Sequence, residues 1–522
     1  MKKSVLLLVF TLVFNIVNAQ FKLIAEGPAF KEPEEGFAKI LQLKTGNTIF
    51  IHISLKEGID TRIYNPAHQE IATNHINPLY DKLGTGSSIE AAFEINGDVV
   101  LMVSKSESRT PVLYRIIIDG KTGAAKEDKQ IAQLAKVSFF AGYAMAFGNV
   151  PQPDFFVRKD PHSDNYALVL LNSFESERSK RIEIISYGAD NKETGRAFYA
   201  SPDEKYKYIR YVDMAVIGSD KVSVLAYGYN TANSGGKASE LILANLDKGA
   251  KTVSFTELGF SMDLLVYHGI CRYNPAIKSL VLIASTKENS KDEGYTPIMA
   301  LVNPFDKKIN RVNVISPSER LDQYSKKGFR GLPQNLFIND DGTFTVVSEE
   351  MAHRYTNYSV TTILGDLAVV NYTKTGEPST DFLIRKSHFI NGGVGPFYQS
   401  YREGTAQRLG GGSQFKSFAY LDGKTKSYIL FNDTERNNEK LESGSLVDIQ
   451  GVSGCDGFYY PLTGSEPILK RDYVFGNPEG KKDHNLGLFS ISDYDRNSNV
   501  YVTLELSNQN GKKNVTVVWL QP

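Results

Sequence analysis

Two stretches in the C-terminal half of the sequence are rich in side chains that bind ligands, "EEMAHRYTNY" (349–358) and "GPFYQSYREGTAQR" (395–408). Tyrosine offers a flat apolar ring with a hydroxyl, and arginine adds a fixed charge, which together suit recognition of a glycan or a peptide. The candidate binding residues are Glu350, His353, Arg354, Tyr358, Tyr398, Tyr401, Arg402 and Arg408. The alternative is that these rings and arginine stems only pack down the loops that carry them.

The sequence gives weaker evidence for acid–base catalysis and for metal binding than for ligand recognition. Glu349 and Glu350 could exchange protons, but no second group stands at a fixed spacing from them. The eight histidines include no pair at i and i+4, and neither a G-x-S-x-G nor an H-E-x-x-H motif occurs. We therefore assign no catalytic residue, metal or cofactor. His268 and His388, beside predicted inner strands, are the histidines that could act as ligands.

The segment "DYDRNSN" (493–499) resembles the start of a calcium-binding loop because Asp and Asn alternate along it. It lacks the glycine at the sixth position, and Leu504 stands where such a loop needs a glutamate. Since Asp and Asn are also the usual residues of tight turns, we interpret the segment as a turn. The glycine-rich stretches "GGVGP" and "GGGSQF" lack the Lys-Ser/Thr of a phosphate loop and are interpreted as loops.

Composition restricts the class of protein. Lys plus Arg equals Asp plus Glu at 59 each, so the concentrated positive charge that drives nucleic-acid binding is absent. Residues 1–19 combine two lysines, a short apolar run and small residues, which predicts a signal peptide cleaved after Ala19 and export to the periplasm or medium. No later stretch approaches about 20 apolar residues, so we expect no membrane span in the mature chain. Cys271 and Cys455 either form one disulfide or are buried thiols.

The elements that must position the candidate residues follow from a repeated pattern. The same pattern occurs eight times: a turn segment that contains Asn, Asp, Gly or Pro, followed by a strand of alternating β-branched residues. Apolar residues precede most of these turns, so each copy predicts a β-hairpin. The copies are "KTGNTIFIHIS" (44–54), "NGDVVLMVS" (96–104), "HSDNYALVLLNS" (162–173), "GSDKVSVLAYG" (218–228), "NPAIKSLVLIAS" (274–285), "NDDGTFTVVSE" (339–349), "LDGKTKSYILFND" (421–433) and "DRNSNVYVTLEL" (495–506).

A second strand-and-turn pattern follows each hairpin, for example "LILANLDKGAK" (241–251) and "SLVDIQGVSG" (445–454). The unit is therefore four strands in up-and-down order, and its long-range repetition is typical of a β-propeller. We predict an all-β fold with a single β-propeller domain over residues 20–522. Eight blades are expected, or seven if one unit fails. Two packed β-sandwich domains are the alternative architecture.

The chain ends predict how the ring closes. The last repeat stops after its third strand at Pro522, and "FKLIAEG" (21–27) is a strand-like stretch ahead of the first unit. We expect this N-terminal strand to pair as the outer strand of the last blade, which removes an exposed sheet edge. Helix is expected to be scarce, and the best candidate is "SPSERLDQYSKK" (316–327), where Ser316 and Glu319 form a capping box between two blades.

The two faces of such a ring should differ. Turns between strands one and two, and between three and four, are mostly short. Loops between strands two and three, and between blades, are often long and should gather on the other face, where binding is usual. The long loops are 228–240, 286–297, 349–359 and 390–414. We therefore place the candidate binding residues, all on the last two loops, on this long-loop face.

The leader ending "VNAQ" and the repeated "NDDG-x-F-x-V-V-S-E" units resemble those of the uncharacterised exported β-propellers common in Bacteroidota. The Trp-Asp ends of WD repeats, the Gly-Gly pairs of kelch units and the S-x-D-x-G-x-T-W box of sialidases do not occur. The resemblance implies export and fold, and it transfers no catalytic residue.

The first functional hypothesis is a non-catalytic binding or scaffold propeller of the cell envelope that engages a glycan or another protein through the long-loop face. The alternative is a propeller enzyme, a hydrolase or lyase acting on polysaccharide or peptide, with carboxylates at the axial mouth. A cluster of carboxylates or histidines around the channel opening would favour the enzyme. A flat surface of tyrosine and arginine without such a cluster would favour binding.

Overall fold

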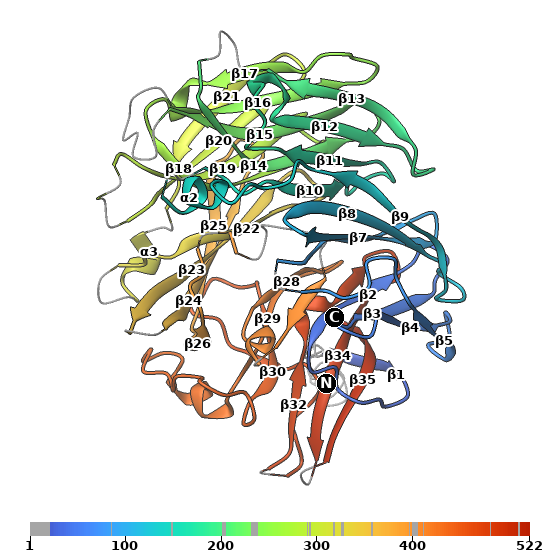
Figure 1. The fold of residues 1–522 in the computed structure, drawn as a ribbon. Coiled ribbons are helices and arrows are strands. Elements are labelled where there is room, and N and C mark those ends of the chain that lie inside the picture. The colour runs from blue at the N-terminus through green and yellow to red at the C-terminus, as the bar shows by residue number, and fades with distance from the viewer. Residues whose placement is uncertain are drawn as a thin grey trace, which may run out of the picture.

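A computed structural model describes residues 21–522, except residues 85, 148–149, 201–204, 231–238, 290, 292–293, 317–318, 325–327, 357–358, 396, 399–405, 411, 481 and 510–511. The predicted signal peptide, residues 1–19, lies outside the described residues, as do three candidate binding residues, Tyr358, Tyr401 and Arg402. Figure 1 shows the described chain as eight β-sheets around a common axis.

Each sheet is an antiparallel blade whose strands follow one another in chain order, and from the first to the sixth blade the first strand of each blade contacts the first strand of the next around the axis. Blades 1 and 2 comprise β2 (Gly36–Gln42), β3 (Thr48–Ile53), β4 (Ile59–Tyr64), β5 (Glu70–Ile76), β6 (Ser88–Ile95), β7 (Asp98–Glu107), β8 (Thr110–Ile118) and β9 (Ala125–Gln133). Blades 3 and 4 comprise β10 (Asp154–Lys159), β11 (Tyr166–Leu171), β12 (Ile182–Tyr187), β13 (Glu193–Tyr199), β14 (Tyr208–Ile217), β15 (Lys221–Tyr229), β16 (Glu240–Asp247) and β17 (Ser254–Leu258).

The second half of the ring repeats this arrangement. Blades 5 and 6 comprise β18 (Leu265–Asn274), β19 (Ser279–Lys287), β20 (Thr296–Asn303), β21 (Lys308–Val314), β22 (Leu332–Ile338), β23 (Phe344–Tyr355), β24 (Val360–Tyr372) and β25 (Pro378–Ile384). Blade 7 comprises β28 (Ala419–Asp422), β29 (Ser427–Asp433), β30 (Asp456–Pro461) and β31 (Asp472–Tyr473). Blade 8 comprises β32 (His484–Gly487), β34 (Val500–Gln509), β35 (Lys512–Gln521) and β1 (Lys22–Glu26). The prediction of an all-β, eight-bladed propeller is confirmed.

Short elements lie outside this regular pattern. The strands are β26 (His388–Asn391), which pairs with β24, β27 (Gln407–Leu409), which pairs with β2, and β33 (Asp493–Asp495), which pairs with β34. The helices are α2 (Ala141–Phe147), α3 (Glu319–Asp322), η1 (Arg178–Lys180), η3 (Gly259–Ser261), η4 (Ser413–Phe415), η5 (Glu435–Lys440) and η6 (Phe489–Ile491). α3 confirms the short helix expected within 316–327, whereas α2 was not predicted. Among the described residues, no helix has the length and apolarity needed to cross a membrane.

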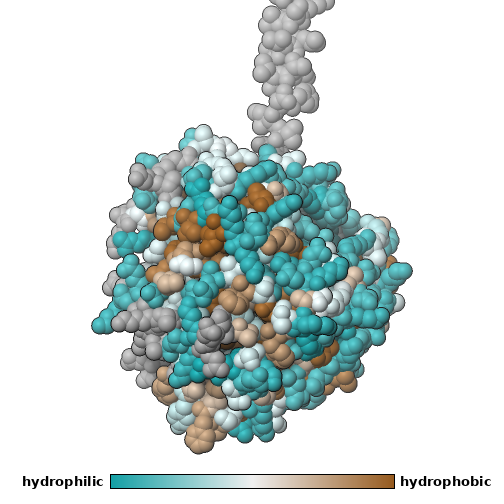
Figure 2. Space-filling model, turned by 90° about the horizontal axis from the view of Figure 1, so that it is seen from above, coloured by the Kyte–Doolittle hydropathy of each residue, from teal (hydrophilic) through white to brown (hydrophobic). Residues whose placement is uncertain are grey.

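The core consists of layers between blades. The second strand of a blade has neighbours on both faces, so β15 is buried along its whole length, whereas the outer strand β21 alternates between exposed and half-buried residues. One apolar layer joins each blade to the next, including the layer between blades 8 and 1 around Trp519. Figure 2, which looks from above onto the edge of the ring, shows a mainly hydrophilic face with small hydrophobic groups.

The N-terminal strand closes the ring as predicted. β1 pairs antiparallel with β35, with Lys22 opposite Gln521, and it forms the outer edge of blade 8 (Figure 1). Phe21 is buried against the rings of three tyrosines in blades 7 and 8. The indole N–H of Trp519 donates a hydrogen bond of 3.0 Å to Thr48 of blade 1. These contacts join the last blade to the first.

Two local predictions are wrong. Residues 445–454 were expected as the third strand of the seventh unit, but that strand is β30, whose aromatic residues fill the layers beside blade 7. The 445–454 segment instead bonds to blade 6, where the N–H of Ile449 donates to the Ser387 carbonyl and the N–H of Phe389 donates to Ile449. Residues 349–359 were expected as a loop, but β23 and β24 continue as a two-stranded ribbon with His353 opposite Thr362.

Candidate functional site

The described residues of the segment 390–414 contact two opposite sides of the ring at its long-loop end. Gly395 lies against His268 on the inner strand of blade 5, and β27 pairs with the inner strand of blade 1, on the opposite side of the ring. Phe397 anchors the segment, because its side chain is 2% exposed within the layer between blades 5 and 6 and its N–H donates to the Pro333 carbonyl. Phe397 has a φ of 58°, a conformation that a bulky residue adopts only under a strong packing constraint. This segment is therefore fastened to the ring at several points.

The described candidate residues of this segment and the ribbon are mostly engaged with their own surroundings. Tyr398 donates its hydroxyl proton to Glu349 at 2.7 Å, and His353 Nε2 lies 2.8 Å from the Val394 carbonyl. The guanidinium of Arg354 lies 5.2 Å from the centre of the Phe389 ring. These contacts hold the ribbon and the 390–414 segment together, which is the packing role that the sequence left open.

Two further candidates lie apart from these contacts. Glu350 is half-buried, burial raises the pKa of its carboxyl, and one carboxylate oxygen accepts the Arg330 N–H at 3.2 Å. Arg408 is exposed on β27, beside blade 1. The described candidates thus share a face, but they do not converge on one cavity.

The carboxylate of Glu349 is a structural group rather than an accessible acid. Its side chain and that of Lys386 are both fully buried, and they form an ion pair of 2.5 Å. Burial lowers the pKa of Lys386, and the charge of Glu349 opposes that shift. The Tyr398 hydroxyl binds the second oxygen of Glu349, so the pair is satisfied within the protein.

His268 and His388 lie on different blades; His268 is half-buried and His388 is buried. Burial, with a contribution from Arg210, lowers the pKa of His268 to about 4. His388 contacts the Lys416 carbonyl through Nδ1 at 3.0 Å, and burial lowers its pKa as well. Within the described ranges, no three His, Cys, Asp or Glu side chains come together in a way that could hold a metal ion. Cys271 and Cys455 are both buried free thiols, so the disulfide alternative does not apply.

Within the segment 493–499, residues 493–495 form β33 and residues 496–499 form the turn that leads into β34, so the interpretation as a turn holds for its second half. The carboxylate of Asp495 accepts the N–H groups of Asn497 and Ser498, and Asn499 has a φ of 56°. Asp493 is occupied by the N–H of Gln42 at 2.7 Å, which ties blade 8 to blade 1.

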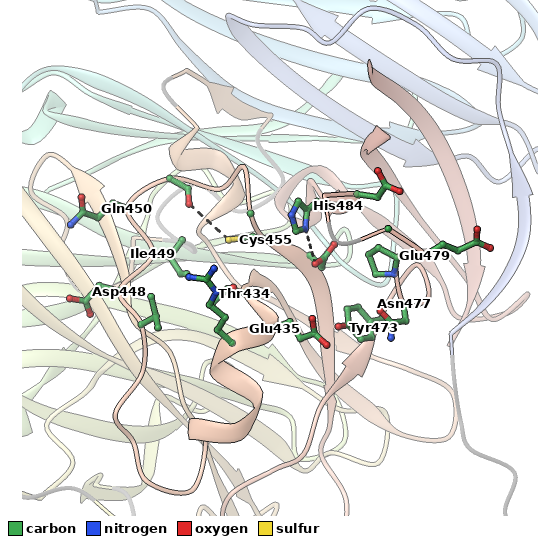
Figure 3. A pocket seen from close by; sticks show the side chains of 18 residues that line it. Thr434, Glu435, Asp448, Ile449, Gln450, Cys455, Tyr473, Asn477, Glu479 and His484 are labelled. Atoms are coloured by element: carbon green, nitrogen blue, oxygen red, sulfur yellow. Dashed lines mark hydrogen bonds and ion pairs between the residues drawn. The ribbon is translucent and has the colours of Figure 1, made fainter. Parts of the chain in front are cut away.

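A groove that the sequence did not reveal lies on the long-loop face between blades 7 and 8. One wall is the connection from β29 to β30, residues 434–455, and the other is the connection from β31 to β32, residues 474–483. Its volume is about 590 Å³. Figure 3 shows side chains from both connections around this space, with Tyr473 and Asn477 on one side and Asp448 and Gln450 on the other.

Two polar side chains of this groove, Asp456 and His484, are paired with each other. Asp456 is the first residue of β30, and one of its oxygens accepts the N–H of Asn485 at 2.8 Å. The other oxygen lies 3.1 Å from His484 Nδ1, a contact drawn in Figure 3. Burial raises the pKa of Asp456, and the bonds from Asn485 and His484 oppose this shift. His484 is therefore held in one orientation beside the groove, with Nε2 as the nitrogen directed away from Asp456.

The charge of the groove is acidic. The lining carries five carboxylates and one arginine in addition to His484. The carboxylates are Glu435, Asp448, Asp456, Glu479 and Asp483, and the arginine is Arg436. The lining also carries four neutral donors and acceptors, Thr434, Gln450, Asn477 and Tyr473. The sequence did not predict this group of lining residues. They come from two separate connections, which become neighbours only when the blades fold into a ring. The acid- and amide-rich run "NDTERNNEKLES" (432–443) was the available signal.

A second feature of the long-loop face is an exposed aromatic cluster at α2, in the connection between blades 2 and 3. Phe139, Phe140, Tyr143 and Phe147 are 71%, 80%, 60% and 83% exposed. Their rings contact one another, with centres 6.1 to 6.5 Å apart. The spacing of Phe139, Tyr143 and Phe147 at i, i+4 and i+8 is the sequence signal that predicts a helix with one aromatic face.

No family model and no curated protein matches this chain. Among solved structures, the chain is similar to the polysaccharide lyase Uly1, with 10% identity, a TM-score of 0.38, and coverage of 86% of this chain and 92% of the lyase. It is also similar to a protein of unknown function from Bacteroides caccae, with 8% identity, a TM-score of 0.26, and coverage of 62% and 89%. A xylan β-1,4-xylosidase from Bacillus halodurans C-125 matches with 9% identity, a TM-score of 0.26, and coverage of 97% and 99%.

Proposed function

We propose that this protein is an exported, non-catalytic binding propeller that recognises a glycan in the groove between blades 7 and 8. The observation that carries this proposal is the groove itself, a concave space of about 590 Å³ on the long-loop face with a polar lining from two separate connections. Concave sites with a few convergent polar groups on a rigid scaffold are the usual form of a small-ligand site. A flat protein partner would leave this depth unfilled.

The charge of the groove restricts the class of glycan. Five carboxylates against one arginine and a histidine would repel a polymer of uronates or sulfated sugars. Carboxylates and amides accept hydrogen bonds from sugar hydroxyls, and the Tyr473 ring offers an apolar surface for a sugar face. We therefore infer that the ligand is a neutral or amine-bearing glycan.

The test is a glycan-array screen with the mature protein, followed by affinity measurement on the best ligand. The double variant Gln450→Ala/Glu479→Ala removes one hydrogen-bonding side chain from each wall of the groove, and each loss should cost about 1 kcal/mol. We expect affinity to fall about tenfold or more. The matched control is Gln130→Ala/Glu288→Ala, which alters two exposed residues away from the groove and should leave affinity unchanged. Equal affinity of all three proteins would refute the groove as the site.

A catalytic role is the second candidate, and one observation favours it. The carboxyl of Asp456 has a raised pKa and holds His484 at 3.1 Å, which is a proton donor–acceptor pair at the edge of the groove. An enzyme would release new reducing ends or unsaturated products from the glycans that bind. His484→Gln should abolish that release while leaving binding within a few fold. If no bound glycan yields a product, catalysis is excluded and binding is the only proposed function that remains.

Export is part of the proposal, because a signal peptide is expected at residues 1–19. The mass of the protein recovered from the periplasm or medium should correspond to a chain that begins at Gln20. A full-length chain retained in the cytoplasm would contradict export.

A further inference from the structure

The aromatic cluster at α2 is carried by a segment without charge. Phe139, Phe140, Tyr143 and Phe147 are each at least 60% exposed. The sequence 137–153 contains no Asp, Glu, Lys, Arg or His. Grouped apolar side chains on the surface of a folded protein mark a site of interaction. This segment can leave water without burying a charge, which is the costly step when a surface is covered by an apolar phase.

The four rings do not serve the fold. α2 belongs to no blade sheet (Figure 1), and Ala141 is its one buried residue. Among the described residues, the apolar layers between blades include none of the four rings. The segment is held through its backbone, because the N–H of Val137 donates to the Arg109 carbonyl at 2.9 Å. The rings are therefore available to a partner outside the chain.

Other exposed apolar side chains lie on the same face of the ring. Leu79, Met262 and Tyr324 are 65%, 54% and 37% exposed on connections between blades, and Tyr355 is 75% exposed on the ribbon of blade 6. On the short turns, Phe305 is the one described residue in this class, and the remaining members lie on outer strands. Apolar exposure at the two ends of the ring is therefore concentrated on the long-loop face.

The size and spread of this surface favour a lipid layer over a protein. An aromatic side chain carries about 150–250 Å², so the cluster at α2 exposes roughly 500–600 Å². A stable protein interface needs about 800 Å² from each partner. Leu79, Met262, Tyr324 and Tyr355 cannot add to one compact patch, because they lie on connections of different blades. A flat, continuous lipid surface can contact several of these connections at once.

We propose that the long-loop face binds a lipid surface reversibly, with the aromatic cluster at α2 inserted at the level of the headgroups. Aromatic rings concentrate at this depth of a bilayer, where Tyr143 can keep its hydroxyl in water while the phenylalanine rings contact acyl chains. The acidic groove between blades 7 and 8 lies on the same face, so the lipid should be zwitterionic rather than anionic. This inference does not depend on the ligand of that groove.

The first test is co-sedimentation of the mature protein with phosphatidylcholine vesicles. We expect reversible binding with a partition constant on the order of 10⁴ M⁻¹, comparable to that of a single acyl chain. Because the inserted segment has no charge, binding should be unchanged between about 0.05 and 0.5 M NaCl. Absence of binding, or binding that is lost at the higher salt concentration, would overturn the proposal.

A pair of variants tests whether the cluster at α2 carries the binding. Phe140→Ser/Phe147→Ser removes two rings that are 80% and 83% exposed and should lower the partition constant about tenfold or more. The matched control is Phe198→Ser/Phe305→Ser, which removes two exposed rings from an outer strand and a short turn. The control should bind vesicles like the unaltered protein. Equal binding by the two double variants would contradict the assignment to α2.

A third variant reports the position of the cluster and separates a lipid from a second copy of the chain. Phe147→Trp places a fluorophore in the cluster, and the chain's own Trp519 is fully buried. Brominated phosphatidylcholine should quench the new emission, and vesicle binding without quenching would overturn the proposal. In the absence of lipid, light scattering should give a monomer. A dimer that dissociates in Phe140→Ser/Phe147→Ser would assign the cluster to self-association instead.

Discussion

At the residue scale, two carboxylates placed opposite each other in blade 7 have been given different roles by their partners. Asp433 at the end of β29 is paired in register with Asp456 at the start of β30. Arg471 binds Asp433 at 2.5 Å with both side chains almost fully buried, whereas Asp456 binds His484 beside the groove. Arg471 compensates the buried negative charge of Asp433. Asp456 can therefore face a ligand without an uncompensated negative charge next to it.

This arrangement makes Arg471 a sensitive position for stability. Arg471→Met leaves Asp433 buried without its cation, which should lower the free energy of unfolding by about 3–5 kcal/mol. The double variant Arg471→Met/Asp433→Asn removes both charges and should recover part of that loss. Denaturant unfolding of the three proteins measures both effects. A single variant as stable as the unaltered protein would show that the pair contributes nothing.

Glu505 gives a prediction about pH. Burial, together with the nearby charge of Glu26, raises the pKa of Glu505 to about 7 from 4.5. The folded state therefore binds this proton more tightly than the unfolded state, so the free energy of unfolding falls as pH rises from about 4.5 to 7. One pKa unit corresponds to about 1.4 kcal/mol, so a shift from 4.5 to about 7 sets an upper bound of roughly 3.5 kcal/mol.

Glu505→Gln should remove this dependence. The variant should be more stable than the unaltered protein at pH 8, and the two should differ little at pH 4. Chemical denaturation at both pH values tests the difference. A variant that loses stability at pH 8 would mean that the ionised carboxylate makes a favourable contact.

At the element scale, the predictable features were those set by local turn chemistry. The hairpin turns such as Asn96-Gly97 and Asp341-Gly342 need a positive φ at their glycines, and both glycines have one. The errors arose where partners come from elsewhere in the ring. Ile449 was assigned to a strand because its neighbours alternate, but its hydrogen bonds go to blade 6. β27 pairs with β2, near the other end of the sequence, and no local pattern specifies that pairing.

Phe397 tests how the 390–414 segment is held. Phe397→Ala removes a buried ring from the layer between blades 5 and 6, which should cost about 3–5 kcal/mol. We expect faster hydrogen–deuterium exchange around Phe397, whose N–H is bonded to Pro333. The control Tyr355→Ala alters an aromatic residue that is 75% exposed on the neighbouring ribbon and should change little. Unchanged exchange in Phe397→Ala would show that other contacts fasten the segment.

At the scale of the whole molecule, the ring depends on closure by the two chain ends. Blade 8 is completed by β1, and an apolar layer joins it to blade 1 as in every other junction. The eight-fold repetition, the single ring and the closure could be predicted, because each follows from repeated patterns along the sequence. The groove between blades 7 and 8 could not, because it is formed by residues from two separate connections.

Removal of residues 21–26 tests the closure. The deletion exposes the edge of β35 and removes Phe21 from its tyrosine contacts. We expect a lower melting temperature and concentration-dependent aggregation through the exposed edge. Thermal unfolding and light scattering at two protein concentrations measure both effects. A deletion variant with unchanged melting temperature and no aggregation would show that β1 is dispensable.

The most direct test of the proposed function is hydrogen–deuterium exchange of the mature protein with and without its tightest-binding glycan. Recognition in the groove between blades 7 and 8 predicts slower exchange in 447–456 and 477–487, with little change elsewhere. Protection confined to 139–147, to the 390–414 segment or to the short-turn face would contradict it.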